Sequence, residues 1–187
     1  MRRTLLWVAA FAAVTGIVAT YALSAEPGWY VRIRYPLRYE VTLRAHADTY
    51  RLDPALVAAV IYAESKFDPG TRSAAGAVGL MQLLPATAQG IADRTGGARF
   101  TPADLVDPEI NIRYGSWYLR HLRSHYAGRP DATRLSLAAY NAGVANVDRW
   151  VAATPKGRPV AIPFSETSAY VARVLHLRDL YRRGYGL

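Results

Sequence analysis

Three of the prolines that follow a typical capping residue in this chain lie where a helical segment begins. The pairs are Asp53-Pro54, Thr101-Pro102 and Asp107-Pro108. An Asp or Thr in this place accepts hydrogen bonds from the free N–H groups of the first turn, and proline is tolerated best at the first helical position. Each pair therefore predicts a helix start. Ser165 before Glu166 predicts a fourth, since an acidic residue is favourable in a first turn.

Glycines punctuate the ends of the same segments, while the alternation that marks strands is scarce. Helices are expected at 38–51, 54–66, 86–95, 102–106, 108–126, 132–142, 144–152 and 166–183. The chain has 187 residues and no cysteine, which excludes a disulfide scaffold, a thiolate nucleophile and zinc sites with Cys ligands. The sequence predicts a single all-α domain, residues 38–187, stabilised by an ordinary core.

A separate apolar segment occupies the N-terminus. After Arg2 and Arg3, no charged residue occurs until Glu26. The apolar stretch 5–23 is 19 residues long, close to the ~20 that span a bilayer and longer than the ~7–15 of a cleavable signal core. Residues 1–25 are thus expected to be a transmembrane anchor with its positive end in the cytoplasm, or a signal peptide cleaved after residue 24 or 25. Residues 26–37 are expected to be a juxtamembrane linker.

The chain is strongly basic, with 23 Lys+Arg against 14 Asp+Glu and a formal charge of +9. Such a charge suits nucleic acid, an anionic membrane surface or an acidic wall polymer, although scattered arginine also suits a plain solubilising surface. Either reading of the N-terminus takes the domain out of the cytoplasm, so we expect no nucleic-acid partner. His121 and His125 share a helix face at a metal-like spacing but lack a third ligand, and we expect no metal and no cofactor.

Glu64 ends an otherwise apolar helix face formed with Val57, Val60 and Ile61. A carboxyl placed where the core meets the surface is partly desolvated, which raises its pKa and suits it to act as a general acid. The same position also fits a residue that merely ends the helix or pairs with a neighbouring cation.

Two further segments place amides and an aromatic ring near apolar helices. Gly76 and Gly79 give backbone freedom before a short segment that contains Gln82, an amide able to donate and accept hydrogen bonds to a sugar. Tyr140 and Asn141 end a small-residue helix, and rings of this kind stack on sugar faces. Alternatively, the glycines only form turns and the Tyr-Asn pair only packs and caps.

In combination, these segments resemble the lytic transglycosylases of the soluble type, whose catalytic domain (SLT) is similar to goose-type lysozyme. The resemblance covers roughly residues 39–181 and is carried by four motifs: Glu64-Ser65, Gly76-Ala77-Val78-Gly79-Leu80-Met81-Gln82, Ala139-Tyr140-Asn141-Ala142-Gly143 and Ile162-Pro163-Phe164-Ser165-Glu166-Thr167-Ser168-Ala169-Tyr170-Val171. The segment 35–39, after an apolar N-terminus, is similar to the membrane-anchored subgroup. The resemblance implies a lysozyme-like catalytic domain in the cell envelope, held at the cytoplasmic membrane or secreted after cleavage, and acting as a monomer.

The resemblance also implies a reaction. Glu64 would protonate the β-1,4 oxygen between N-acetylmuramic acid and N-acetylglucosamine in peptidoglycan. As a carboxylate it would then take the proton of the muramoyl 6-hydroxyl, which forms a 1,6-anhydro end. Most glycosidases pair two carboxylates, but Asp68 beside Pro69 fits a turn better. A lysozyme-type hydrolase and a non-catalytic peptidoglycan-binding protein remain alternatives.

The other matched positions are substrate-binding in the family: Ser65, Gly79, Met81, Gln82, Tyr140, Asn141, Glu166 and Tyr170. Ser65 would help hold the N-acetyl group, and Met81 with Gln82 would line the groove. Tyr140 and Asn141 would face the catalytic residue, with the Tyr140 hydroxyl orienting it. Glu166 and Tyr170 would border the peptide-bearing side.

Overall fold

The computed structural model describes residues 2–155 and 157–187; Met1 of the predicted N-terminal segment and Lys156 of the predicted domain lie outside them. Its elements are α1 (Arg2–Ala25), α2 (Gly28–Arg34), α3 (Glu40–Thr49), α4 (Pro54–Ser65), α5 (Pro85–Thr95), η1 (Pro102–Val106), α6 (Pro108–His125), α7 (Ala132–Ala142), α8 (Val144–Ala153) and α9 (Ser165–Tyr185). All eight predicted helices are confirmed with ends within two residues, 102–106 being a 3-10 helix. The described residues form no strand, only isolated bridges at Val78.

The predicted caps explain these helix starts. Asp53 Oδ1 accepts from the backbone N–H of Ala55 at 3.1 Å, and Asp107 Oδ1 accepts from that of Glu109 at 2.8 Å. The fourth predicted start differs in detail. Ser165 is the first residue of α9 rather than its cap, and the cap position is extended backbone without a side-chain hydrogen bond.

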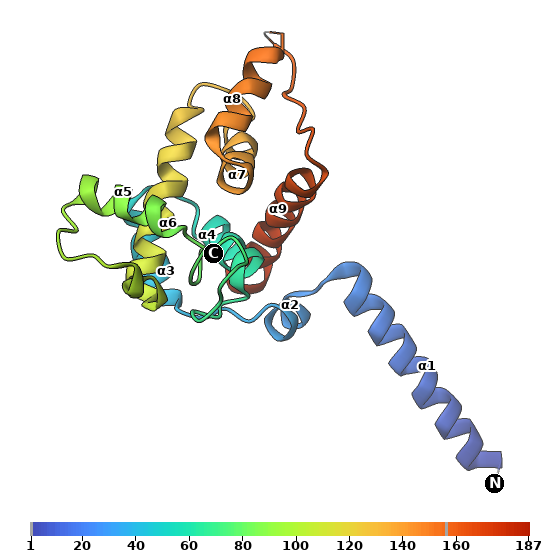
Figure 1. Cartoon of the computed structure of the whole chain (residues 1–187). Helices are drawn as coiled ribbons and strands as arrows, with labels where there is room; N and C mark the ends of the chain where they lie inside the picture. The colour runs from blue at the N-terminus through green and yellow to red at the C-terminus, as the bar shows by residue number, and fades with distance from the viewer. Residues whose placement is uncertain (1, 156) are drawn as a thin grey trace.

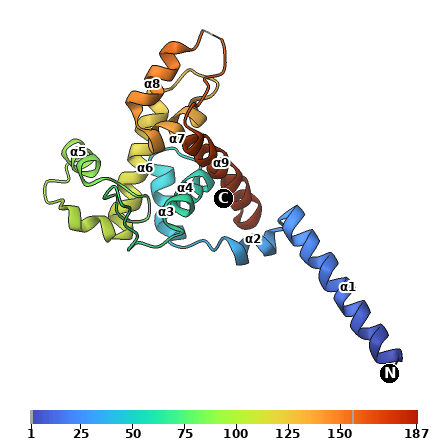
Figure 2. The same cartoon turned by 45° about the vertical axis from the view of Figure 1, so that its right-hand side comes forward.

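Helix α4 forms the centre of the main core. Every residue from Ala55 to Ile61 is buried, because α3, α9 and the other core helices surround this helix (Figures 1 and 2). A helix that is apolar all round is stable only when it is enclosed in this way. The apolar stripe that ends at Glu64 is therefore only part of a fully buried segment.

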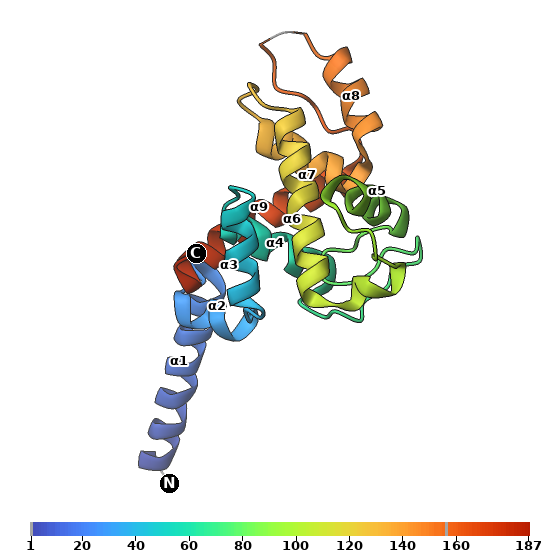
Figure 3. The ribbon, with the colours of Figure 1, turned by 90° about the vertical axis from the view of Figure 1, so that its left-hand side faces the viewer.

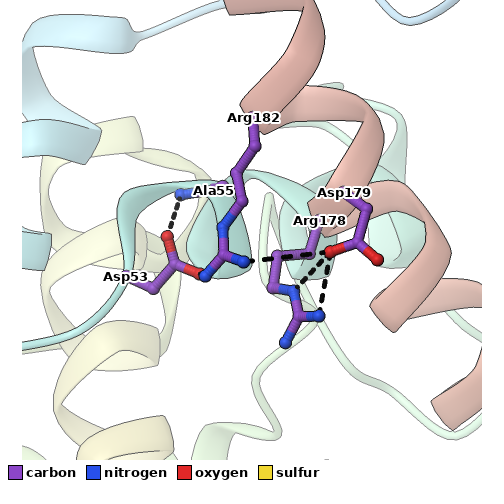
Figure 4. Close-up of polar contacts among 5 residues, drawn as sticks. All are labelled: Asp53, Ala55, Arg178, Asp179 and Arg182. Carbon is purple, nitrogen blue, oxygen red and sulfur yellow. Dashed lines mark hydrogen bonds and ion pairs between the residues drawn. The ribbon is translucent and has the colours of Figure 1, made fainter. Parts of the chain in front are cut away.

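Asp53 also connects the start of α4 to the end of α9. Its Oδ1 atom caps α4 while Oδ2 accepts from Arg182 at 2.7 Å (Figure 4). Arg182 further lies 4.0 Å from Asp179, whose carboxylate accepts from Arg178 at 2.8 Å. One carboxylate thus caps a helix and pairs with an arginine that lies 129 residues further along the chain.

A smaller hydrophobic cluster lies beside the main core, where α5, η1 and the first half of α6 meet (Figure 3). Its buried members are Val78, Leu83, Ala88, Ile91, Ala92, Leu105 and Tyr114. The non-helical segment 66–84 contributes two of them and runs between the two clusters. This segment contains the second sequence motif, and its position between two packed units holds it in place.

The first two helices differ from the rest. Helix α1 projects away from the domain (Figures 1 and 2). Among the residues that the structure describes, no helix has the length and apolarity needed to cross a bilayer. Residues 28–34, expected to lie in a linker, form α2 instead, and Val31 is completely buried against α9. The folded unit therefore extends further toward the N-terminus than the sequence indicates.

Candidate active site

Glu64 lies in the last turn of α4, just before the chain reverses. Lys66 and Phe67 have φ values of 53° and 65°, and the buried Phe67 ring packs edge-on against Tyr181 at 6.2 Å between centroids. Asp68 Oδ1 then accepts from the backbone N–H of Gly70 at 2.9 Å, which confirms its turn role. The reversal leaves the Glu64 side chain at the edge of the core.

A tyrosine hydroxyl from α9 holds the Glu64 carboxyl. Tyr170 donates to Glu64 Oε1 at 2.6 Å. Burial raises the pKa of Glu64, while the Tyr170 hydrogen bond and the guanidinium of Arg173 partly oppose the rise. Within the described chain, the groups that tune this pKa include no second carboxylate. Glu64 is thus a single, half-buried carboxyl with an increased tendency to carry a proton.

The prediction that the Tyr140 hydroxyl orients Glu64 is wrong. Tyr140 donates instead to the backbone oxygen of Met81 at 2.6 Å, and its ring packs against Tyr118 at 5.5 Å. Tyr140 still lies near the carboxyl, because the charge of Glu64 is one cause, after burial, of its raised pKa. Tyr170, expected on the peptide-bearing side, takes the orienting role.

Asn111 holds the motif segment 78–81 in place, a role that the sequence motifs do not predict. Its completely buried side chain accepts from the backbone N–H of Met81 at 2.7 Å and donates to the carbonyls of Val78 and Leu105 at 3.0 and 2.8 Å. The signal available in the sequence was a single amide between Ile110 and Ile112 on α6. A buried amide that is hydrogen-bonded through both N–H groups and its oxygen acts as a template for the chain around it.

Gly79 is required by this template. Its φ is 85°, and a Cβ atom there would collide with the Asn111 side chain and the Leu105 carbonyl. The missing side chain therefore makes room for the protein's own amide. In this structure Gly79 is a packing requirement of the loop, and an approach of its backbone to substrate is not needed to explain it.

The side chains of Met81 and Gln82 are largely engaged within the protein. Met81 is 0% exposed and packs against Gly115 of α6, so its side chain does not line a groove as expected. Gln82, at φ 46°, donates through Nε2 to the carbonyls of Thr71 and Gly79 at 3.0 and 2.9 Å. Of the two, only Gln82 is partly exposed.

Ser65 is a buried link between α4 and the loop. Its Oγ atom lies 2.8 Å from the carbonyl of Leu80 and 3.1 Å from that of Ile61. One hydroxyl has one proton, so the shorter contact assigns it to Leu80. In this structure the Ser65 proton positions the loop beside Glu64.

The remaining predicted residues lie where α7 ends and α9 begins. Asn141 is exposed, and its Oδ1 accepts from the buried Thr167 hydroxyl at 2.8 Å. Glu166 is exposed in the first turn of α9. Three segments far apart in sequence, from α4, α7 and α9, thus converge around Glu64.

A sequence profile of the transglycosylase SLT domain matches residues 42–160. The chain belongs to this family. It is 33% identical over 156 residues to the soluble lytic murein transglycosylase of Escherichia coli, covering 80% of this chain and 24% of that protein. It is also 30% identical over 169 residues to the membrane-bound lytic murein transglycosylase C of Serratia proteamaculans, covering 78% of this chain and 47% of that protein.

Solved structures confirm the all-helical, lysozyme-like SLT fold. An inactive mutant of the lytic transglycosylase Slt of Pseudomonas aeruginosa matches with a TM-score of 0.74 at 33% identity, over 83% of this chain and 26% of that one. The 70-kDa soluble lytic transglycosylase in complex with bulgecin A matches with a TM-score of 0.74 at 32% identity, over 82% and 25%. The chain spans about a quarter of the length of the soluble relatives and 47% of the membrane-bound one.

Proposed function

We propose that this chain is a peptidoglycan lytic transglycosylase with Glu64 as its acid and base. The β-1,4 bond between N-acetylmuramic acid and N-acetylglucosamine is its target. Residues 38–187 form the catalytic domain, and the product carries a 1,6-anhydro-muramoyl end. The observation that carries the proposal is a lone, half-buried carboxyl with a raised pKa, held by Tyr170 at 2.6 Å inside an SLT domain.

A single carboxyl can perform both proton transfers of this reaction. Protonated Glu64 gives its proton to the bridging oxygen as the anomeric C–O bond breaks, and the N-acetyl group of the substrate assists at the anomeric carbon. The Glu64 carboxylate then takes the proton from the 6-hydroxyl as that oxygen bonds to the anomeric carbon. No water is consumed, and the raised pKa supports the first step.

We assign the substrate groove to exposed or half-exposed polar groups around Glu64. Asn141, Glu166 and the Gln82 amide supply hydrogen bonds to the sugar and stem peptide. Tyr140 lies beside them, held by its hydrogen bond to the backbone oxygen of the buried Met81. The Ser65 hydroxyl keeps lone pairs that can accept from the N-acetyl N–H.

The test compares Glu64→Gln with Glu40→Gln on purified sacculi. Glu40 is exposed and pairs only with Arg44 among the residues described, so its substitution controls for loss of a surface carboxylate. Glu64→Gln should lower cleavage about 100- to 10,000-fold or more, since Glu64 acts in two steps. Retained cleavage by Glu64→Gln would remove this residue from the mechanism.

Product analysis separates the neighbouring functions. Mass spectrometry of the released fragments should show anhydro ends and no new reducing ends. Reducing ends would indicate a lysozyme-type hydrolase, in which water replaces the 6-hydroxyl. Binding to sacculi without release of fragments would indicate a non-catalytic wall-binding protein.

We also propose that residues 1–25 attach the domain to the outer side of the cytoplasmic membrane. The support is the uncharged stretch after Arg2 and Arg3, together with α1 projecting from the domain. Mass spectrometry of the mature chain tests it: a start at Ala25 or Glu26 would indicate a cleaved signal peptide and a secreted enzyme. Retention in the membrane fraction is the expected result.

A further inference from the structure

The segment between α1 and the domain is clamped to the end of α9. The Glu26 carboxylate lies 3.3 Å from His176 and 3.7 Å from Arg183. Arg32 donates to the backbone oxygen of Gly184 at 2.6 Å, and Gly184 lacks a side chain where the buried Val31 packs. These contacts fix α2 on the domain over its whole length.

The free face of α2 is apolar. Trp29 and Ile33 each lie two residues from Val31, which places them about 160° around the helix from it. Their exposed fractions are 49% and 74%. A docked helix of a water-soluble surface normally turns polar residues outward. Helix α2 does the reverse: its buried side chain is Val31, while its outer face is an indole and an isoleucine.

Basic side chains flank this face. Arg32 and Arg34 lie on either side of the Trp29–Ile33 line, and both are exposed. Arg183 follows on α9, with Glu26 as its only described ion-pair partner. An apolar strip bordered by arginine matches the interface of a bilayer with anionic lipids, where tryptophan and arginine side chains are favoured.

The carboxylates on this end of the molecule leave the positive charge in excess. Asp53 and Asp179 are the described acidic groups at the end of α9, and they pair with Arg182 and Arg178. Glu26 is shared between His176 and Arg183. Arg32 and Arg34 form no described ion pair with a carboxylate. Arg32 donates through Nε to the Gly184 carbonyl and Arg34 through Nη1 to the Tyr62 hydroxyl, so each exposed guanidinium keeps further N–H groups for lipid phosphates.

We propose that the α2 face made of Trp29, Ile33, Arg32 and Arg34 lies on the anionic lipid surface and fixes the orientation of the domain. The inference rests on the proposed attachment through residues 1–25 and adds the surface that contacts lipid. Arg34 at the end of α2 donates to the hydroxyl of Tyr62 on α4 at 3.2 Å, and Glu64, two residues beyond Tyr62, lies about 160° around α4 from it. The active site is thereby directed away from the membrane toward the wall.

The chain contains no cysteine, so a single introduced thiol is the only site that a thiol-reactive label can modify. Full-length Ile33→Cys and Phe164→Cys proteins are each labelled with the fluorophore nitrobenzoxadiazole. Phe164 is a matched control: it is 47% exposed and precedes the start of α9, whereas α2 contacts the end of this helix, which is about 30 Å long. The proteins are mixed with vesicles of phosphatidylcholine, with and without phosphatidylglycerol, and binding is measured separately by flotation.

On anionic vesicles the label at position 33 should brighten and shift to the blue, while the label at position 164 should not change. Neutral vesicles or high salt should reduce the shift, because screening weakens the attraction of arginine to lipid phosphates. If the protein floats but the label at position 33 stays in water, or both labels shift alike, the inference is overturned while the attachment stands. Failure to float would overturn the attachment and the inference, and leave the assignment of peptidoglycan cleavage intact.

Discussion

The side chain of Asn111 should determine whether the motif segment 78–81 keeps its conformation. Asn111→Ala removes three hydrogen bonds of 2.7 to 3.0 Å to completely or nearly completely buried partners. Each contributes about 1 kcal/mol net, and a buried partner left without a hydrogen bond costs about 1–3 kcal/mol. Because relaxation of the surrounding chain recovers part of this sum, we expect a loss of about 3–5 kcal/mol in the free energy of unfolding.

Activity should fall as well, for a separate reason. Asn111 holds the backbone N–H of Met81, and the backbone carbonyl of the same residue accepts from the Tyr140 hydroxyl of α7. Movement of this segment disturbs Leu80, which accepts from Ser65 next to Glu64. We therefore expect cleavage of sacculi to drop even at temperatures where the variant is folded.

The assay is denaturant unfolding of the full-length chain followed by circular dichroism. Asn146→Ala is the matched control, since this asparagine on α8 makes only local hydrogen bonds among the residues described: it donates to the carbonyl of Ala142 at 2.7 Å and accepts from the exposed Arg149. Its loss should stay below about 1 kcal/mol. The reasoning is refuted if Asn111→Ala costs no more than Asn146→Ala.

Three further predictions concern Glu64 and its surroundings. Tyr170→Phe removes a hydrogen bond that lowers the pKa of Glu64, so the alkaline limb of the pH–rate profile should move to higher pH and the rate should fall about tenfold; an unmoved limb would contradict the assignment. Burial raises the pKa of Glu64 above its usual 4.5, so the free energy of unfolding of the wild type should fall as the pH rises above 4.5 and the buried carboxyl loses its proton. Glu64→Gln should abolish this fall, and unfolding measured at acid and at neutral pH checks it. Gly79→Ala should destabilise the fold by several kcal/mol, about as much as Asn111→Ala, because its φ of 85° and the adjacent Asn111 leave no room for a methyl group; a thermal midpoint equal to wild type would refute this.

Local chemistry accounts for what could be predicted. The helix starts at Asp53 and Asp107 depend on hydrogen bonds to residues two or three positions away, and the structure confirms them. The turn at Asp68 is of the same kind. That Glu64 ends an apolar helix face is also a local pattern, while its role as the candidate acid comes from the resemblance of the four motifs.

Prediction failed where a role depends on distant partners. The Tyr140 hydroxyl was expected to orient Glu64, but Tyr170, 106 residues from Glu64, makes that contact. The sequence predicts a linker at 26–37 because this stretch is short and mixed in composition. Its helix forms because Val31 finds a site against Gly184 at the other end of the chain.

Local patterns in the sequence predict the all-helical class, the helix boundaries and the uncharged stretch 4–25, because caps, prolines, glycines and apolar periodicity act within a few residues. The candidate acid, Glu64, follows from the motif that it forms with Ser65. Packing settles which groups set the pKa of Glu64, that Asn111 is the template of the segment 78–81, and that the outer face of α2 is apolar. These properties depend on burial, on hydrogen bonds that join α6 and α7 to Met81 and α9 to α4, and on the contact of α2 with α9. They exist only once helices far apart along the chain are packed together.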